Sequence, residues 1–338
     1  MIFIKISIFL IILYLIFRYN ITEYFNEEDL LDKSNRKFPF RYFKDENDNI
    51  IPIIALTAFF RSHEDKKLYY KYINAGYKVI GITAYKTFPI KIRDNSEDKF
   101  HLTDDFNYCN EIKVWLTCMQ NINLYNFTNF NITYDLSESD FYDIDYLNTD
   151  KKYDFIYICN KDNDNCALDG WNAINRNYNL ALKCFPIMVN EYKLKGLCVG
   201  RIGCDLSMYD FGSNITITDF LPYNELQQKM RESRFLFLPN IYDASPRVIA
   251  ECLIKDVPVL MNQSIICGFK YINKQTGEFF IDEHNIRNAL DNIFVNKSPR
   301  KWWSENHSRD INSKKLRDFL YTQYPEIVKN IKSISFII

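Results

Sequence analysis

FLFLPNIYDASPRVIAECLIKDVPVLMN, residues 235–262, has the pattern of a strand, a turn, a helix and a second strand. The apolar run 235–238 is typical of a buried parallel strand, and 257–260 is typical of the next one. Between them, Ser245 stands where a helix N-cap belongs. Pro246 follows at the first helical position, where its missing N–H costs nothing. The stretch therefore predicts a strand–helix–strand unit of an α/β fold.

Two carboxylates flank the start of the predicted helix. Asp243 lies in the loop, and Glu251 follows eight positions later on the second helical turn. Arg247 stands four residues before Glu251 and projects from the same side of the helix. Unpaired N–H groups from Ser245 to Val248 and the positive end of the helix dipole favour an anion there. These groups suit a ligand with hydroxyls and a diphosphate; a capped helix with an Arg247–Glu251 surface pair remains the alternative.

This pattern resembles the donor-binding segment of GT-B glycosyltransferases, in particular the family 4-like (group 1) retaining enzymes. Their hallmark is an acidic residue, seven residues and then Glu across a strand, loop and helix. Here it is Asp243-Ala-Ser-Pro-Arg-Val-Ile-Ala-Glu251, with Asp in place of the usual first Glu. The segments 219–230 and 276–294 resemble the elements that flank this unit in the family. The resemblance covers roughly 153–294, less than half of the chain.

The resemblance implies two Rossmann-like parallel-sheet domains with a cleft between them. It implies a hexosyltransferase-type enzyme that moves a sugar from a nucleotide-sugar donor, its co-substrate, to a glycan, protein or lipid acceptor, with retention and with neither metal nor cofactor. Glu251 would hold the ribose hydroxyls and Asp243 the donor sugar, with Arg247 beside them in the catalytic site. The further residues implied at the donor are Ser245, Pro246, Val248, Lys161, Arg176, Arg201 and Gly268.

Departures from the family's pattern leave other functions open. Asp169 stands where the family has a phosphate-binding Lys, and the loop 60–65 lacks the family's glycines. One alternative is a non-catalytic, membrane-anchored GT-B-like protein that binds a glycan or a partner. A second is a GT-A-like metal-dependent glycosyltransferase, in which Asp162 and Asp164 would hold a divalent metal. A structural surface protein with an unrelated α/β fold is a third.

Composition narrows the classes further. A chain of 338 residues favours two domains of ordinary size. Its net charge of −1, without a basic block, lacks the electrostatic footprint of nucleic-acid binding. Nine cysteines without a CxxC pair argue against a zinc ribbon. They predict mostly reduced thiols, with Cys159–Cys166 and Cys198–Cys204 as the two candidate disulfides.

The N-terminal segment 1–18 is nearly all apolar, with no small-residue cleavage site after it. This predicts an uncleaved signal anchor and a single-pass membrane protein of an endomembrane lumen or of a viral or host membrane. The predicted organisation is a signal anchor 1–18, a stem or linker 19–49, an N-terminal acceptor-side Rossmann-like domain 50–150, a C-terminal nucleotide-sugar-binding domain 151–296 and C-terminal helices 297–338.

The remaining segments give a coarser pattern. Strands are predicted at 51–58 and 78–83 with a helix at 63–74 between them, which is typical of a parallel-sheet domain. A further helix is predicted at 111–121 with Trp115 turned inward. In the tail, Trp302 and Trp303 are expected to anchor a helix that returns onto the first domain.

Overall fold

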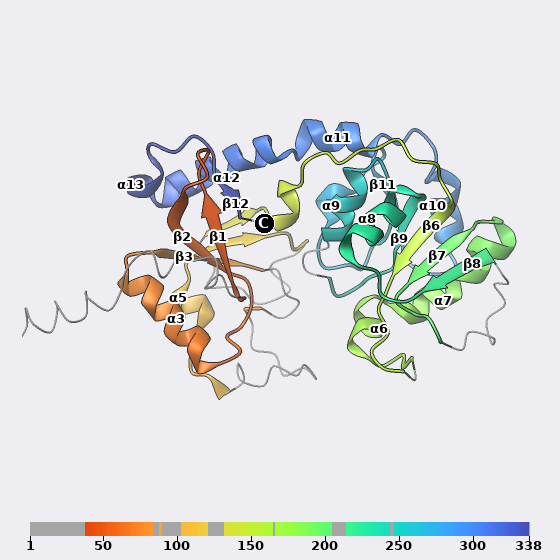
Figure 1. Cartoon of the computed structure of the whole chain (residues 1–338), viewed down its shortest axis with the longest axis horizontal. Coiled ribbons are helices and arrows are strands. Elements are labelled where there is room, and N and C mark those ends of the chain that lie inside the picture. The colour runs from red at the N-terminus through yellow and green to blue at the C-terminus, as the bar shows by residue number, and fades with distance from the viewer. Residues whose placement is uncertain are drawn as a thin grey trace, which may run out of the picture.

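The computed structural model describes residues 38–83, 88–89, 103–120, 132–164, 166–204, 214–243 and 247–337. These residues form two α/β domains that lie side by side, each built on one six-stranded sheet (Figure 1). Helices α11 (Pro299–Asn306) and α12 (Arg309–Gln323) run along one side of the molecule and connect the two domains. The two-domain α/β architecture predicted from the sequence is confirmed.

The first domain contains a mixed sheet in the order β12-β1-β2-β3-β4-β5. Its strands are β1 (Phe40–Lys44), β2 (Ile50–Leu56), β3 (Lys78–Ile82), β4 (Val114–Thr117), β5 (Ile132–Asp135) and β12 (Ser335–Phe336). Strands β2 to β5 are parallel, whereas β1 runs antiparallel to both β2 and β12. This domain therefore combines segments from the two ends of the described chain.

Both faces of the first sheet are covered, because successive residues of a strand point to opposite sides. Ile54 packs on the face covered by α3 (His63–Asn74), whereas Ile53 packs on the face covered by Leu316 of α12. Helix α3 begins at Ser62, whose hydroxyl accepts a hydrogen bond from the third backbone N–H of the helix. Two short helical turns belong to the same domain, α5 (Tyr108–Glu111) and η3 (Glu138–Phe141).

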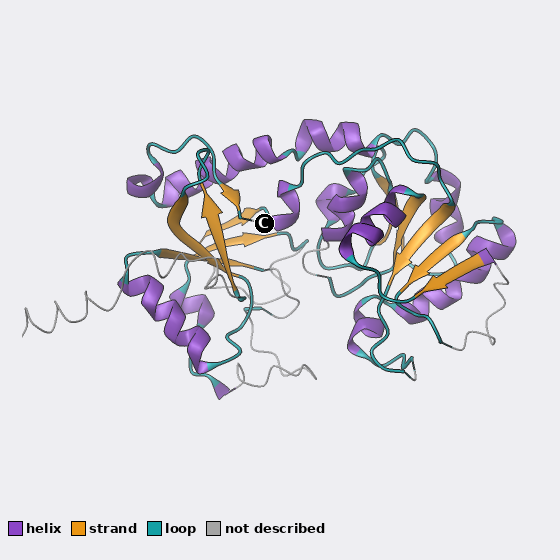
Figure 2. Cartoon of the chain, in the orientation of Figure 1, coloured by secondary structure: helices purple, strands orange, loops and turns teal. Residues whose placement is uncertain are grey.

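The second domain contains a fully parallel sheet in the order β11-β10-β9-β6-β7-β8. Its strands are β6 (Tyr153–Ile158), β7 (Gly196–Val199), β8 (Ile215–Thr218), β9 (Ser233–Leu238), β10 (Val259–Asn262) and β11 (Gly277–Phe280). Its helical elements are α6 (Trp171–Asn175), α7 (Tyr178–Pro186), the π-turn η4 (Ile187–Glu191), α8 (Tyr223–Arg231), α9 (Arg247–Leu253), η6 (Phe269–Tyr271) and α10 (Ile286–Asn292). Figure 2 shows helices around this sheet: α7 and α10 pack on one face, and α8, α9 and α11 on the other. This is a doubly wound sheet whose strand order reverses between β6 and β9.

Three sequence predictions fail in instructive ways. The segment 111–121 is not a helix: α5 ends at Glu111 and β4 follows. Its Trp115 is fully buried, as predicted, but from a strand that is covered on both faces. The predicted linker 19–49 contains β1, whose aromatic residues belong to the core of the first sheet. The tail is not only helical, because β12 pairs with β1, and a short α13 (Pro325–Val328) precedes it.

The tryptophan anchor is also placed differently. The side chain of Trp303 is buried in the core of the second domain, and its indole N–H donates to the backbone carbonyl of Tyr142 at 3.0 Å. The return onto the first domain is made by Leu316 and Leu320 of α12. The tail thus contacts each domain with a different helix.

Most cysteines are free thiols, as predicted, but the disulfide pairing differs from both predicted pairs. The disulfide joins Cys166 to Cys204, so neither Cys159–Cys166 nor Cys198–Cys204 forms. Cys159 and Cys198 are free thiols on buried positions of the sheet. Cys166 and Cys204 lie instead in the loops that follow β6 and β7. Because these strands are adjacent, the two loops leave the sheet side by side.

The predicted membrane location is wrong: no helix within the described parts of 38–337 is long and apolar enough to cross a membrane. The apolar segment 1–18 itself lies outside the described residues.

A buried cluster around Asp140 of η3 joins the two domains. The Asp140 carboxylate accepts hydrogen bonds from the Lys270 ammonium at 2.8 Å and the Tyr271 hydroxyl at 3.0 Å, both on η6. It also accepts the Ser137 backbone N–H at 2.7 Å and lies 3.0 Å from His307 Nδ1, just after α11. We call these five residues the Asp140 cluster. It fixes the end of the first domain against the second domain and the tail.

Candidate functional site

The carboxyl ends of the parallel strands of both domains face the interdomain boundary. The loop after β4 and the loop after β10 touch there, where Met119 and Cys267 form an isolated antiparallel bridge. The Gln120 backbone N–H donates to the Ile266 carbonyl at 3.0 Å beside it. In open α/β sheets, ligands bind beyond the carboxyl ends of the strands at the point where strand order reverses. That point in the second domain lies between β6 and β9.

Asp243 and Arg176 meet at this point. Asp243 is in the loop after β9, and Arg176 ends α6, the first helix after β6. One Arg176 guanidinium nitrogen forms an ion pair with Asp243 Oδ2, and the Asn240 side-chain amide donates to the same oxygen at 3.1 Å. The Arg176 side chain is 31% exposed and the Asp243 side chain 13%. The structure thus brings together two predicted site residues that are 67 positions apart in the sequence.

Glu251 lies on α9, the helix that follows the loop containing Asp243, and is 9% exposed. Its Oε1 accepts a hydrogen bond from the Tyr142 hydroxyl at 3.3 Å. Burial and the nearby Glu251 charge raise the pKa of Tyr142, so the phenol stays protonated and remains a donor at neutral pH. Within the described residues, Arg247 is not an ion-pair partner of Glu251, although the two stand one helical turn apart. The surface pair considered from the sequence does not form.

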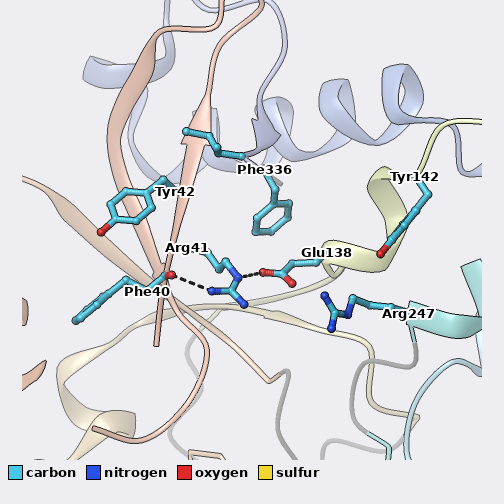
Figure 3. A pocket seen from close by; sticks show the side chains of 8 residues that line it. Phe40, Arg41, Tyr42, Glu138, Tyr142, Arg247 and Phe336 are labelled. Atoms are coloured by element: carbon cyan, nitrogen blue, oxygen red, sulfur yellow. Dashed lines mark hydrogen bonds and ion pairs between the residues drawn. The ribbon is translucent and has the colours of Figure 1, made fainter. Parts of the chain in front are cut away.

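A pocket of about 280 Å³ lies where α9 approaches the first domain (Figure 3). In Figure 3, Arg247 points from α9 toward Glu138, and Arg41 enters from β1 on the opposite side. The Arg41 Nε donates to Glu138 Oε1 at 2.5 Å. The lining residues are Phe40, Arg41, Tyr42, Glu138, Tyr142, Arg247, Phe336 and Ile337. Tyr142 links Glu251 to the pocket, because it lines the pocket and its hydroxyl donates to Glu251.

The other residues predicted at the donor differ in their burial and surroundings. Arg201 is fully buried, donates to the Cys159 carbonyl at 3.1 Å and lies over the Tyr178 ring. This burial removes it from a ligand that enters from solvent. Val248 is half-buried against the core of the second domain. Gly268 has a φ of +93°, which lets the chain turn into η6. Ser245 and Pro246 lie outside the described residues.

The two acidic residues considered for a metal have different partners. Asp162 accepts the backbone N–H groups of Asn172 at 2.8 Å and Ala173 at 3.1 Å, so its carboxylate caps α6. Asp164 is exposed beside Lys161, with 3.4 Å between ammonium and carboxylate. A Cβ on Gly170 would lie 2.3 Å from Asp162, so the cap requires glycine there. No cluster of three potential metal-binding side chains occurs in the described ranges.

Sequence reasoning missed Tyr142, Arg41 and Glu138. Arg41 and Glu138 are 97 residues apart and carry no motif. Tyr142 belongs to an acidic, aromatic stretch without a clear period. These side chains come near α9 only in the fold, with Arg41 on β1, Glu138 on η3 and Tyr142 just after η3.

Comparisons with known proteins identify similar folds among solved structures. No protein-family model matches the sequence, and no curated protein matches it. Among solved structures, the chain is similar to TarM, with a TM-score of 0.55 and 13% identity over 78% of this chain. It spans 54% of TarM, about half of that protein's length.

Two other solved structures are covered more completely. Anabaena Alr3699/HepE, crystallised in complex with UDP and glucose, gives a TM-score of 0.54 and 10% identity over 79% of this chain and 78% of HepE. Sucrose-phosphate synthase from Thermosynechococcus elongatus gives a TM-score of 0.52 and 11% identity, over 81% and 74% respectively. Identities this low establish the fold alone. With its two facing α/β domains and the tail that crosses back, the chain has the GT-B fold of glycosyltransferases.

Proposed function

We propose that the chain is a glycosyltransferase that moves a sugar from a nucleotide-sugar donor to a glycan, protein or lipid acceptor. The observation that carries this proposal is the placement of Asp243 in the loop after β9, beside the strand-order reversal of a GT-B fold, and of Glu251 on α9, the helix that follows this loop. Two carboxylates there can accept hydroxyl hydrogen bonds from a sugar and a ribose. The HepE structure, which holds UDP and glucose, has the same overall fold.

The roles of the side chains follow from their partners. Glu251 uses Oε1 for Tyr142, and its carboxylate has further lone pairs for ribose hydroxyls. Asp243 is held in place by Arg176 and Asn240, so its orientation toward the donor sugar is fixed before the ligand arrives. Arg176 is a positioning residue for Asp243, and its exposed side can face the diphosphate.

We further propose that transfer is retaining and uses no metal. Retention is what the resemblance to the family 4-like enzymes implies. The support for metal independence is the Arg176 guanidinium, which is 31% exposed and paired with Asp243 in the loop that joins β9 to α9. Positive charge fixed at the departing diphosphate can supply the stabilisation that a divalent cation supplies elsewhere. Lys161 is a further cation after β6, half-buried and near the end of that strand.

The test is a screen of nucleotide sugars with the purified chain in EDTA, measuring thermal stabilisation and nucleotide release. A donor at 100 times its Kd should stabilise the fold by about 2.7 kcal/mol. Glu251→Gln should lose this stabilisation. Glu326→Gln, on the exposed surface of α13 in the first domain, should keep it.

Three outcomes would count against parts of the proposal. If no donor stabilises a well-folded sample, the glycosyltransferase function is refuted. If a donor binds in a Glu251-dependent manner but no transfer or release occurs, the protein binds sugars without catalysis. Activity that requires manganese would refute metal independence.

A further inference from the structure

Residues of the first domain form most of the lining of the pocket between α9 and the first domain. Seven of its eight lining residues come from the first sheet, from η3 or from the chain that crosses after it, and only Arg247 comes from the second domain. Because β1 is antiparallel to β2, Phe40 lies opposite Leu56, at the carboxyl end of β2. The pocket therefore lies across the boundary from the donor side, at the carboxyl edge of the first sheet.

The size of the pocket restricts its occupant. At about 280 Å³ it lies just below the range of roughly 300–1,000 Å³ that is typical of small-molecule sites. A single ring or head group fits such a volume, whereas a whole nucleotide sugar does not. Part of the lining is apolar, with Phe336 beside the Arg41–Glu138 pair (Figure 3). Apolar walls lower the local dielectric constant and so strengthen charge interactions inside.

The charged groups of the pocket are unbalanced. Arg41 is paired with Glu138 and also donates to the Phe40 carbonyl at 3.2 Å. Arg247 makes no hydrogen bond or ion pair with any residue that the structure describes, although it lines the same pocket. Two guanidinium groups thus face one carboxylate. The Tyr142 hydroxyl does not offset this excess, since it is protonated and donates to Glu251.

We propose that this pocket binds an anionic group, a phosphate or a carboxylate, carried by the acceptor. Arg247 would contact the anion through its planar pair of N–H donors. Arg41 would contribute from the opposite wall while Glu138 holds it in place. The inference rests on the proposed function, because it assigns the pocket to the acceptor of the same reaction. It predicts that acceptors with a negative charge near the reacting hydroxyl are used in preference to neutral ones.

The experiment measures binding of three anionic probes: inorganic phosphate, glycerol 3-phosphate and glucuronate, with methyl glucoside as the neutral comparison. Titrations at constant ionic strength, by calorimetry or thermal shift, are made with and without saturating UDP. The anions should bind equally well in both conditions. Arg247→Gln should weaken them about tenfold, the loss of one charged contact, and should change UDP affinity less than threefold.

Two further variants sharpen the result. Glu138→Gln removes the negative charge of the pocket and should strengthen anion binding. Arg287→Gln removes a guanidinium that is paired with Glu191 on the outer surface of the second domain, and should leave anion binding unchanged. If Arg287→Gln has the same effect as Arg247→Gln, binding is non-specific and the proposal is refuted.

The remaining outcomes separate this inference from the proposed function. If UDP displaces the anions, or if Arg247→Gln weakens UDP instead, Arg247 serves the donor diphosphate and the acceptor assignment is wrong. If UDP binds through Glu251 but no anionic probe binds, the pocket assignment fails while the proposed function stands. Anion binding in a protein that binds no nucleotide sugar would overturn the acceptor assignment as well.

Discussion

Replacing Asp140 by Asn should destabilise the protein more than any other isosteric change at the domain boundary. The carboxylate is fully buried and receives hydrogen bonds from Ser137, Lys270 and Tyr271, with His307 Nδ1 at 3.0 Å. Asparagine keeps the shape but removes the charge, and its amide N–H₂ faces groups that are themselves donors. The Lys270 ammonium is then left largely buried without its main partner.

The magnitude follows from this burial. Removing one partner of a buried ion pair typically costs about 3–5 kcal/mol. Lys270 retains a second carboxylate, Asp135, at 3.0 Å, which places the expected loss near the lower end, about 3 kcal/mol. With an unfolding entropy of about 2 cal/mol/K per residue, a chain of 338 residues should lose roughly 4 °C in Tm.

The loss of stability caused by Asp140→Asn should also depend on pH. Burial alone would raise the pKa of Asp140, but Lys270 and His307 outweigh it and hold the pKa below its usual value of 3.8. A carboxyl group with a lowered pKa contributes stability that is present above the unfolded pKa and lost as pH falls through the folded pKa. The difference in stability between wild type and Asp140→Asn should therefore be present at neutral pH and shrink as the pH falls below 4.

The assay is denaturant unfolding of the whole chain followed by tryptophan fluorescence, supported by thermal scans. Trp303 lies beside the Asp140 cluster and should respond to its loss. The matched control is Asp135→Asn, which removes a carboxylate from the same lysine at a position 65% exposed, and should cost less than 1 kcal/mol. If Asp140→Asn costs no more than Asp135→Asn, the cluster does not stabilise the boundary as argued.

Two further predictions concern the candidate site, and a third concerns the disulfide. Tyr142→Phe should weaken UDP binding two- to fivefold without changing the fold, measured by calorimetry; an unchanged Kd would contradict a positioning role for its hydroxyl. Arg176→Gln and Asp243→Asn should each raise the donor KM about tenfold, and the double variant should cost little more than either one; full additivity in the kinetic cycle would show that the pair does not act as a unit. Cys166→Ser removes the disulfide to Cys204, 38 residues away, and should cost up to about 4 kcal/mol; a Tm equal to that of the oxidised wild type in a thermal scan would contradict this.

Sequence reasoning was most successful in the second domain. The run 235–238 is apolar without interruption, which is typical of a strand covered on both faces, and it forms the end of β9. The helix that carries Arg247 and Glu251 depends on local spacing, so it could be predicted. Its predicted cap, Ser245, and its predicted first residue, Pro246, lie outside the described residues. The resemblance that extended this unit to a GT-B fold is confirmed by the structure.

What failed depended on contacts between distant segments. A four-residue strand such as β4 has no period long enough to distinguish it from a helix. The disulfide pairing follows from the adjacency of β6 and β7, which spacing alone does not give. Arg201 stands at a strand end, as a phosphate ligand would, yet its guanidinium is fully buried over the Tyr178 ring. The position of Arg201 in the sequence therefore did not predict that its side chain would be buried.

The order in which the chain is synthesised has a consequence for β12. Domains usually fold as units during synthesis, the N-terminal one first. Here β1 and β2 emerge early, but Ser335 and Phe336, which pair with the outer edge of β1, emerge after the whole second domain. Until then the first sheet has an open edge and lacks the cover of α12. The described strands of the second domain are all synthesised by Phe280, so its sheet can form while the first sheet still lacks Ser335 and Phe336.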